Sequence, residues 1–266
     1  MNKVIPLAEA AGRVKHGDTL ALGGMTLYRR PVGFVRALLR REKPPGELTL
    51  LCFTAGLESD LLVGAGLVRR TRTCYFGLES FGLAPMFTQV AMAGEIEVVE
   101  ETESSLAFGL RASIAGVGFM AGRGWLGTDM LSVRPDVRTV ADPYSGEELV
   151  AFPAIDCDVA VIHALQADPR GNCVLGGNLA VDRELALVAR EVIITAEEVV
   201  DKLTGSVDVS GLAVTGVVQV PQGAYPTSCH PLYPVAGGEL MRYVESCPDG
   251  FDAYLGEFLT ATPAAD

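Results

Sequence analysis

Two kinds of hydrophobic pattern alternate along this chain. Short, nearly continuous apolar runs are separated by longer segments in which apolar residues recur every three or four positions. Short apolar runs are typical of strands covered on both faces of a parallel sheet, and the longer segments are typical of amphipathic helices. The pattern predicts strands at residues 19–22, 48–53, 68–75, 96–99, 148–152, 159–163, 192–195 and 214–220.

The helical segments fall between these strands. They are predicted at residues 7–14, 31–41, 59–63, 85–93, 104–115 and 179–189, with a further helix within 239–259. The glycine-rich segment 116–127 is predicted to form a loop over the sheet. Repeated strand–helix alternation indicates an α/β fold with an open, mostly parallel sheet and helices on both faces. Because the chain shows no internal repeat, linker or low-complexity tract, residues 1–266 are expected to form one domain.

The composition is that of a protein with a large buried core. Hydrophobic residues make up 49% of the 266 residues, which argues against disorder. No apolar run reaches the roughly 18 residues that a membrane span needs. The N-terminal residues do not form the apolar segment of a signal peptide. We therefore expect a cytoplasmic protein with no membrane partner.

Charge is distributed unevenly along the chain. The net charge of −12 disfavours nucleic acid as a partner. Residues 1–72 nevertheless contain 12 Lys/Arg and 6 Asp/Glu, so this part of the chain is basic. A basic segment within an acidic protein indicates either a local anion site or a surface for an oppositely charged partner. The six cysteines and three histidines lack the spacing of metal ligands, so neither a metal site nor a disulfide is expected.

A diglycine turn is the first candidate for chemistry. A predicted strand at 19–22 runs into Gly23 and Gly24, and Arg29 and Arg30 follow before a helix that a proline opens. Glycines have no Cβ, so a ligand can approach their backbone closely, and a helix N-terminus with nearby arginines attracts a carboxylate or an oxyanion. The alternative is an ordinary strand–helix corner with arginines at the surface.

Three acidic residues and a histidine are further candidates. Glu79 follows a predicted strand and is either a nucleophile or base, or a glutamate that caps a helix or faces solvent. Glu101 and Glu103 belong to an acidic segment before a helix, where they either stabilise the helix dipole or supply a general acid or base. His163 ends a buried strand and is either a ligand-facing acid/base or a core histidine.

Four segments together resemble one known family. They are the diglycine segment 17–31, the helical segment 105–112, the strand-and-turn segment 158–172, and the segment 223–233. In their order and spacing they resemble the A (alpha) subunit of family I CoA-transferases of the glutaconate CoA-transferase type. The resemblance covers most of the chain, roughly residues 5–235.

This resemblance implies a fold, a partner and a reaction. The fold would be the open α/β type, and the chain would need a B (beta) subunit in a heterodimer or heterotetramer. The family reaction uses a CoA thioester as substrate, needs no permanently bound cofactor, and moves CoA to a small carboxylic or dicarboxylic acid. The thioester is attacked by a glutamate of the B subunit, so the resemblance places the nucleophile outside this chain.

The resemblance also implies which residues contact the substrate. These are Gly23, Gly24, Arg29, Arg30, Ser80 and His163. The two glycines would offer backbone groups near the oxyanion, and one of the two arginines would hold the distal carboxylate of the acid. Glu79 and Ser80 lie near the place where the glutaconate type has Asn-Ser, so this chain departs from that type at its substrate site.

Two other functions remain open. The steroid-ring-cleaving hydrolases are a related branch that opens a ring of a CoA-linked substrate, and they resemble the chain about as well. Their A subunit uses a glutamate from the segment that matches residues 100–103, so Glu101 or Glu103 would be catalytic only in a hydrolase. A third hypothesis, from a different class, is a non-catalytic module that binds an anion or a sugar phosphate.

Overall fold

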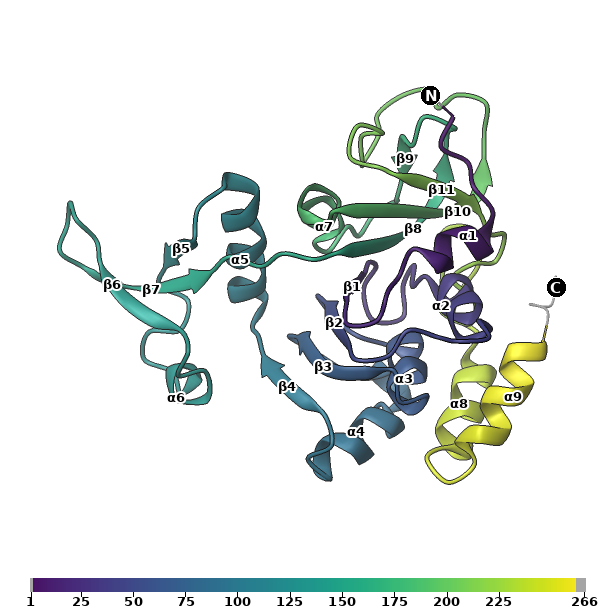
Figure 1. The fold of residues 1–266 in the computed structure, drawn as a ribbon, viewed down its shortest axis with the longest axis horizontal. Helices are drawn as coiled ribbons and strands as arrows, with labels where there is room; N and C mark the ends of the chain where they lie inside the picture. Colours follow the sequence, from purple (N-terminus) through teal and green to yellow (C-terminus); the bar gives the residue numbers. More distant parts are fainter. Residues whose placement is uncertain (1, 262–266) are drawn as a thin grey trace.

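A central sheet organises the chain, of which the computed structural model describes residues 2–261 (Figure 1). The strand order is β11-β10-β8-β1-β2-β3-β4, with β9 paired to β8. Neighbours along this order are parallel, whereas β9 runs antiparallel to β8. The strands are β1 (Thr19–Leu22), β2 (Leu48–Cys52), β3 (Val68–Thr73), β4 (Glu97–Glu100), β8 (Val159–Ala167), β9 (Cys173–Val174), β10 (Glu191–Val199) and β11 (Gly216–Gln219).

Helices cover both faces of this sheet (Figure 1). One face packs against α1 (Leu7–Gly12), α2 (Val32–Leu39), α3 (Leu57–Gly64), α4 (Pro85–Met92), α8 (Gly237–Ser246) and α9 (Phe251–Thr260). The other face packs against α5 (Glu103–Ala115) and α7 (Asp182–Val188). This arrangement confirms the prediction of an open, mostly parallel α/β sheet.

The alternation of side chains along β1 shows why its apolar run forms a strand. Leu20 and Leu22 contribute to the core on one face, and Ala21 contributes to the core on the other face. Successive strand residues point to opposite faces, so a strand with helices on both sides must be apolar at every position. The predicted bounds of this strand agree with the observed ones.

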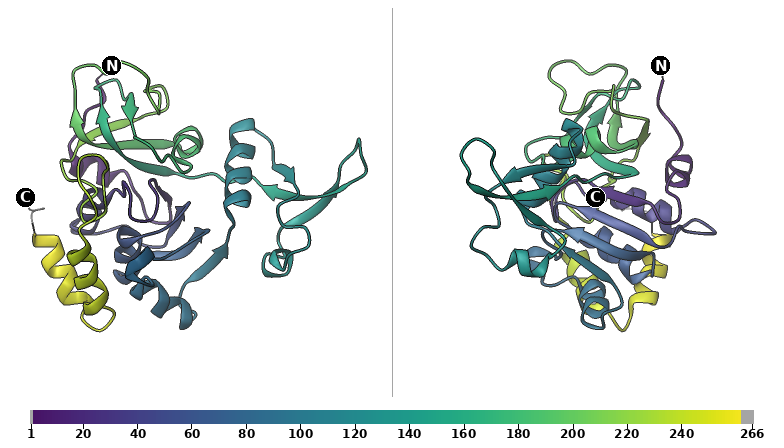
Figure 2. Two further views of the ribbon diagram at one scale, coloured as in Figure 1. Left: turned by 180° about the vertical axis from the view of Figure 1, so that it is seen from behind. Right: turned by 60° about the vertical axis from the view of Figure 1, so that its left-hand side comes forward.

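A second, smaller sheet corrects the prediction for the glycine-rich segment. Residues 116–127 do not form a loop over the main sheet, because they contain β5 (Phe119–Gly122), which pairs with β7 (Glu148–Pro153). With β6 (Arg138–Ala141) these strands form a three-stranded antiparallel sheet that stands off from the main sheet (Figure 2). The short helix α6 (Met130–Val133) lies in the β5–β6 connection. This sheet has its own core of Trp125, Val137, Val150 and Phe152.

The C-terminal segment differs from the prediction in one respect. The pattern predicts one helix within residues 239–259, but α8 ends at Ser246 and α9 begins at Phe251. Pro248 lies between them, and proline cannot continue a helix because it lacks the amide hydrogen. Within residues 2–261, no helix is both long and apolar enough to cross a membrane.

Candidate functional site

The main cavity of interest lies beyond the carboxyl end of β1. In the strand order, β2 lies on one side of β1 and the much later strand β8 lies on the other. Open α/β sheets bind ligands at the carboxyl ends of strands where the order reverses in this way. The cavity has a volume of about 680 Å³. Its lining residues come from four loop regions: Met25, Thr26, Leu27, Tyr28, Glu79, Gly177, Asn178, Ser228, His230, Pro234 and Val235.

The diglycine turn lies directly before these lining residues, but its amides are already used. The amide of Gly23 donates to the carbonyl oxygen of Val161 at 2.9 Å, and the amide of Gly24 donates to Oδ1 of Asp182 at 2.9 Å. Both amides therefore have partners within the protein, and the expected place of the two glycines near the oxyanion stays a prediction. A Cβ on Gly24 would lie 2.5 Å from the carbonyl oxygen of Arg29, so glycine is needed here for close packing.

The two arginines are buried rather than presented to a ligand. Arg29 is 0% exposed, and its Nη2 lies 2.8 Å from Oδ2 of Asp182. Arg30 is also 0% exposed, and its Nη2 lies 2.6 Å from Oε1 of Glu58 while its Nη1 donates to the carbonyl oxygen of Gly24. Both guanidinium groups are thus engaged within the protein, and the expected contact of one of them with a substrate carboxylate stays a prediction. Both side chains support the glycine turn from inside the protein.

Thr26 is a cavity-lining residue that the sequence did not single out. It lies in a tight turn that is closed by hydrogen bonds between Met25 and Tyr28. Its φ of +43° is uncommon for a β-branched residue, and its hydroxyl is buried without a hydrogen-bond partner among the residues described. An unpartnered buried hydroxyl is costly, so a hydrogen bond to this group would be stabilising. A turn built in this way leaves no signal in the local sequence.

Glu79 is brought to the same cavity from the loop after β3. It begins the short 3-10 helix η1 (Glu79–Phe81) and has a φ of +54°. Its amide donates to Oη of Tyr75 at 3.3 Å, which orients the turn. The carboxylate is exposed and makes no hydrogen bond or ion pair within the described part of the chain. Ser80 is exposed beside it but does not line the cavity.

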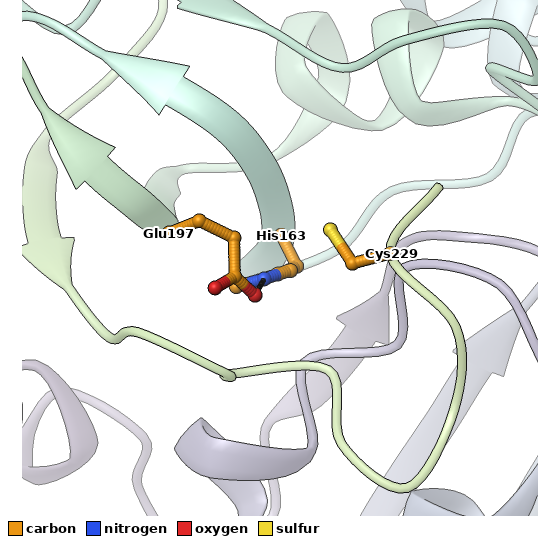
Figure 3. A group of neighbouring side chains, drawn as sticks. All are labelled: His163, Glu197 and Cys229. Atoms are coloured by element: carbon orange, nitrogen blue, oxygen red, sulfur yellow. Dashed lines mark hydrogen bonds and ion pairs between the residues drawn. The ribbon is translucent and has the colours of Figure 1, made fainter. Parts of the chain in front are cut away.

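His163 belongs to a buried polar network (Figure 3). Its ring is 0% exposed, with Nδ1 at 2.9 Å from Oγ1 of Thr195 and Nε2 at 2.8 Å from Oε1 of Glu197. The Glu197 carboxylate also accepts hydrogen bonds from the Tyr233 hydroxyl and the Gln222 amide. The ring therefore links β8 to β10 inside the core, and its expected role as a substrate contact stays a prediction.

The ionisation of this network agrees with a structural role. Burial lowers the pKa of the His163 imidazole below its ordinary value of 6.5. Burial alone would raise the pKa of the Glu197 carboxyl, but the hydrogen bonds it accepts outweigh burial and lower that pKa. Ligand atoms of His163, Glu197 and Cys229 lie within 4.8 Å of one another, as a metal site would require. Burial raises the pKa of the Cys229 thiol to about 12, so the thiol is protonated at neutral pH.

The buried imidazole gives the protein a pH-dependent stability. Since the folded-state pKa of His163 lies below that of the unfolded chain, the unfolded state binds more protons below about pH 6.5. The free energy of unfolding should therefore fall as the pH falls through this range. We expect His163→Gln to show a shallower fall than the wild type in urea titrations at several pH values. His16→Gln, which changes an exposed histidine, should keep the wild-type slope. Equal slopes for all three proteins would contradict the prediction.

The two glutamates after β4 lie outside the cavity. The Glu101 side chain is 2% exposed, with Oε1 at 2.6 Å from Nε of Arg72 and 3.1 Å from Nη1 of Arg134. The hydroxyl of Ser105 also donates to it. Glu103 is exposed in the first turn of α5, where an acidic residue stabilises the helix dipole. The geometry thus supports the structural interpretation of both residues.

Comparison with known proteins adds the family to this geometry. The family described as Coenzyme A transferase matches residues 4–219, which is most of the chain. The chain belongs to the coenzyme A transferase family. Over 240 residues, this chain is 34% identical to the A subunit of the 3-oxoadipate CoA-transferase of Pseudomonas knackmussii, a match that covers 88% of this chain and 84% of the relative. It is 31% identical to the cholesterol ring-cleaving hydrolase IpdA subunit of Rhodococcus jostii, a match that covers 98% of this chain and 93% of the relative.

Solved structures agree with this assignment. Glutaconate coenzyme A-transferase from Acidaminococcus fermentans superposes on this chain with a TM-score of 0.89 and 29% identity, covering 98% of this chain and 90% of the other. A variant of the decarboxylase AibA/AibB superposes with a TM-score of 0.90 and 30% identity, covering 98% and 100%. The family expected from the sequence is thereby confirmed.

Proposed function

We propose that this chain is the A subunit of a heteromeric enzyme that transfers CoA from an acyl-CoA to a small carboxylic acid. One observation carries the proposal: in a member of this family, a cavity of about 680 Å³ lies at the carboxyl end of β1, and the Thr26 hydroxyl and the Glu79 carboxylate on its wall have no hydrogen-bond partner among the described residues. The cavity receives the acyl group. The Thr26 hydroxyl donates a hydrogen bond to the oxygen of the carbonyl or carboxylate that reacts.

The nucleophile comes from a partner chain. A carboxylate of that partner attacks the thioester carbon, and the CoA thiolate leaves to give a mixed anhydride. The thiolate then attacks the partner's carbonyl carbon, which releases the first acid and leaves CoA on the partner as a thioester. The acceptor acid reverses these two steps and departs as the new acyl-CoA. Relatives of this chain are named as the A chains of their CoA-transferases, and the partner is accordingly the B chain.

Reconstitution tests this proposal. The chain is purified alone and together with a B-type subunit of the family. CoA transfer from acetyl-CoA to a panel of short acids is then followed by chromatography of the CoA esters. We expect transfer by the complex and none by either chain alone. Full activity of the isolated chain, or no transfer by the complex to any acid, would overturn the proposal.

Ring hydrolysis is the second candidate, because the IpdA relative matches 98% of the chain at 31% identity. The buried ion pairs of Glu101 with Arg72 and Arg134 leave its carboxylate without access to a substrate. Loss of hydrolysis in Glu101→Ala and Glu103→Ala complexes, with CoA exchange retained, would favour the hydrolase. The hypothesis of an anion or sugar-phosphate module has less support, because no arginine or lysine is among the described residues that line the cavity.

The unpartnered hydroxyl of Thr26 leads to a paired prediction. We expect Thr26→Val to raise the free energy of unfolding by about 1 kcal/mol, because an unsatisfied buried hydroxyl is removed. Both side chains are β-branched, so the backbone cost of the positive φ stays the same. The same change should lower kcat/KM for CoA transfer about tenfold, the value of one hydrogen bond to the substrate.

A control separates these two effects. Thr71 in β3 is also fully buried with an unpartnered hydroxyl, but it does not line the cavity. Thr71→Val should stabilise the protein in urea unfolding and leave kcat/KM unchanged. If both variants lose activity alike, the Thr26 hydroxyl has no specific role in the site.

A further inference from the structure

The charges around the acyl cavity are unbalanced. Glu79 is the one acidic residue among the described lining residues, and no lysine or arginine accompanies it. The apolar part of the wall comes from Met25, Leu27, Pro234 and Val235. His230 is the single lining side chain of the described residues that becomes cationic on protonation. The wall that this chain contributes therefore combines apolar and neutral polar side chains with one carboxylate.

The nearby arginines do not compensate this charge. Arg29 is paired with Asp182 and Arg30 with Glu58, and both guanidinium groups are 0% exposed. Each pair is neutral as a unit, so neither offers a free positive charge to the cavity. The Glu79 carboxylate, in turn, has no cationic partner within residues 2–261 that could draw it away from the cavity.

We infer that Glu79 determines substrate specificity: the acyl cavity accepts monocarboxylic acids with a neutral or cationic tail and rejects dicarboxylic acids. This inference rests on the proposed function. It narrows the range of acceptors expected from the sequence, small carboxylic or dicarboxylic acids, to monocarboxylic acids. A reacting carboxyl group consumes one end of the acid, so a dicarboxylate would place its second charge in the cavity. Two negative charges a few ångströms apart repel, and a site can exclude a competitor through such repulsion.

The backbone at Glu79 supports a role in the site. Its φ of +54° lies in the left-handed region, which costs a residue with a Cβ more than it costs glycine. The Tyr75 hydroxyl accepts a hydrogen bond from its amide and helps to hold this conformation. The turn therefore holds the backbone of Glu79 at the cavity wall, from which its side chain can meet the tail of a bound acid.

The test uses three acids of equal chain length that differ in tail charge. Succinate, butyrate and 4-aminobutyrate serve as acceptors of CoA from acetyl-CoA with the complex of this chain and its B-type partner. The assay is run near pH 8, where histidine side chains are normally neutral. We expect kcat/KM for succinate to be at least about tenfold below that for butyrate. In Glu79→Gln, the ratio of kcat/KM for succinate to that for butyrate should rise, and the ratio for 4-aminobutyrate to butyrate should fall.

The outcomes separate the inference from the proposed function. Glu95→Gln removes the same charge from an exposed position outside the cavity. It should leave the kcat/KM ratios of succinate to butyrate and of 4-aminobutyrate to butyrate at the wild-type values. If the wild-type complex prefers succinate, or if Glu79→Gln leaves both ratios unchanged, the inference is wrong although CoA transfer stands. If Glu79→Gln abolishes transfer to all three acids, Glu79 is needed for the reaction itself and does not determine which acid binds. The inference is then also wrong. If the wild type transfers CoA to no acid at all, the proposed function fails.

Discussion

Gly24→Ala is expected to lower the free energy of unfolding by about 3 kcal/mol. Gly24 has a φ of +82°, and a Cβ placed there would lie 2.5 Å from the carbonyl oxygens of both Arg29 and Tyr28. These are backbone atoms, so the new methyl group cannot be accommodated by a side-chain rotation. The turn that carries Met25 to Tyr28 would have to move, and CoA transfer by the complex should fall with the stability.

Gly17→Ala is the matched control for this prediction. Gly17 has a similar φ of +80°, but an added Cβ would meet nothing within 4 Å. Gly17→Ala should therefore lower the free energy of unfolding by only about 1–2 kcal/mol, the cost of an alanine in the left-handed conformation. It should leave CoA transfer unchanged. Urea unfolding followed by far-ultraviolet circular dichroism measures both variants. Equal losses of stability would mean that the close packing over Gly24 contributes nothing.

The main sheet could be predicted because burial on both faces leaves a mark on the sequence. The central strands of the parallel sheet are apolar at most positions, as Leu20 to Leu22 of β1 are, whereas the edge strand β4 reads EVVE and is mostly exposed. The small sheet lacks this mark. In β6 the residues Arg138 and Thr139 are exposed, and this strand was not predicted at all. In an antiparallel sheet with one open face, apolar and polar residues alternate over only a few positions of each strand. This short alternation is hard to recognise next to a glycine-rich segment.

The candidate site was predicted in its location but not in its chemistry. The diglycine segment does lead into the cavity, and Glu79 does reach it. The role of Arg29 could not be predicted, because its ionic partner Asp182 is 153 positions away in the sequence. A local pattern shows which groups are present but not which of them neutralise one another in the fold. The unpartnered hydroxyl of Thr26 depends on tertiary packing in the same way.

The buried ion pair beneath the glycine turn gives the largest expected loss of stability. We expect Glu58→Gln to lower the free energy of unfolding by about 4 kcal/mol, because it leaves the Arg30 guanidinium buried without a counter-charge. Both side chains are 0% exposed, so water cannot replace the lost carboxylate. Nη1 of Arg30 also holds the carbonyl oxygen of Gly24 at 3.0 Å, so the turn that leads into the cavity should loosen.

A surface pair provides the comparison for this variant. Glu147→Gln removes the same charge from a pair with Arg123 in which the side chains are 40% and 72% exposed. Exposed pairs contribute at most about 1 kcal/mol, so this variant should unfold close to the wild-type urea concentration. Because the charge change is identical, a large difference between the two variants isolates the effect of burial. A small loss in Glu58→Gln would mean that Arg30 finds another partner or reaches solvent. In that case Arg30 would again be a candidate for binding a substrate carboxylate.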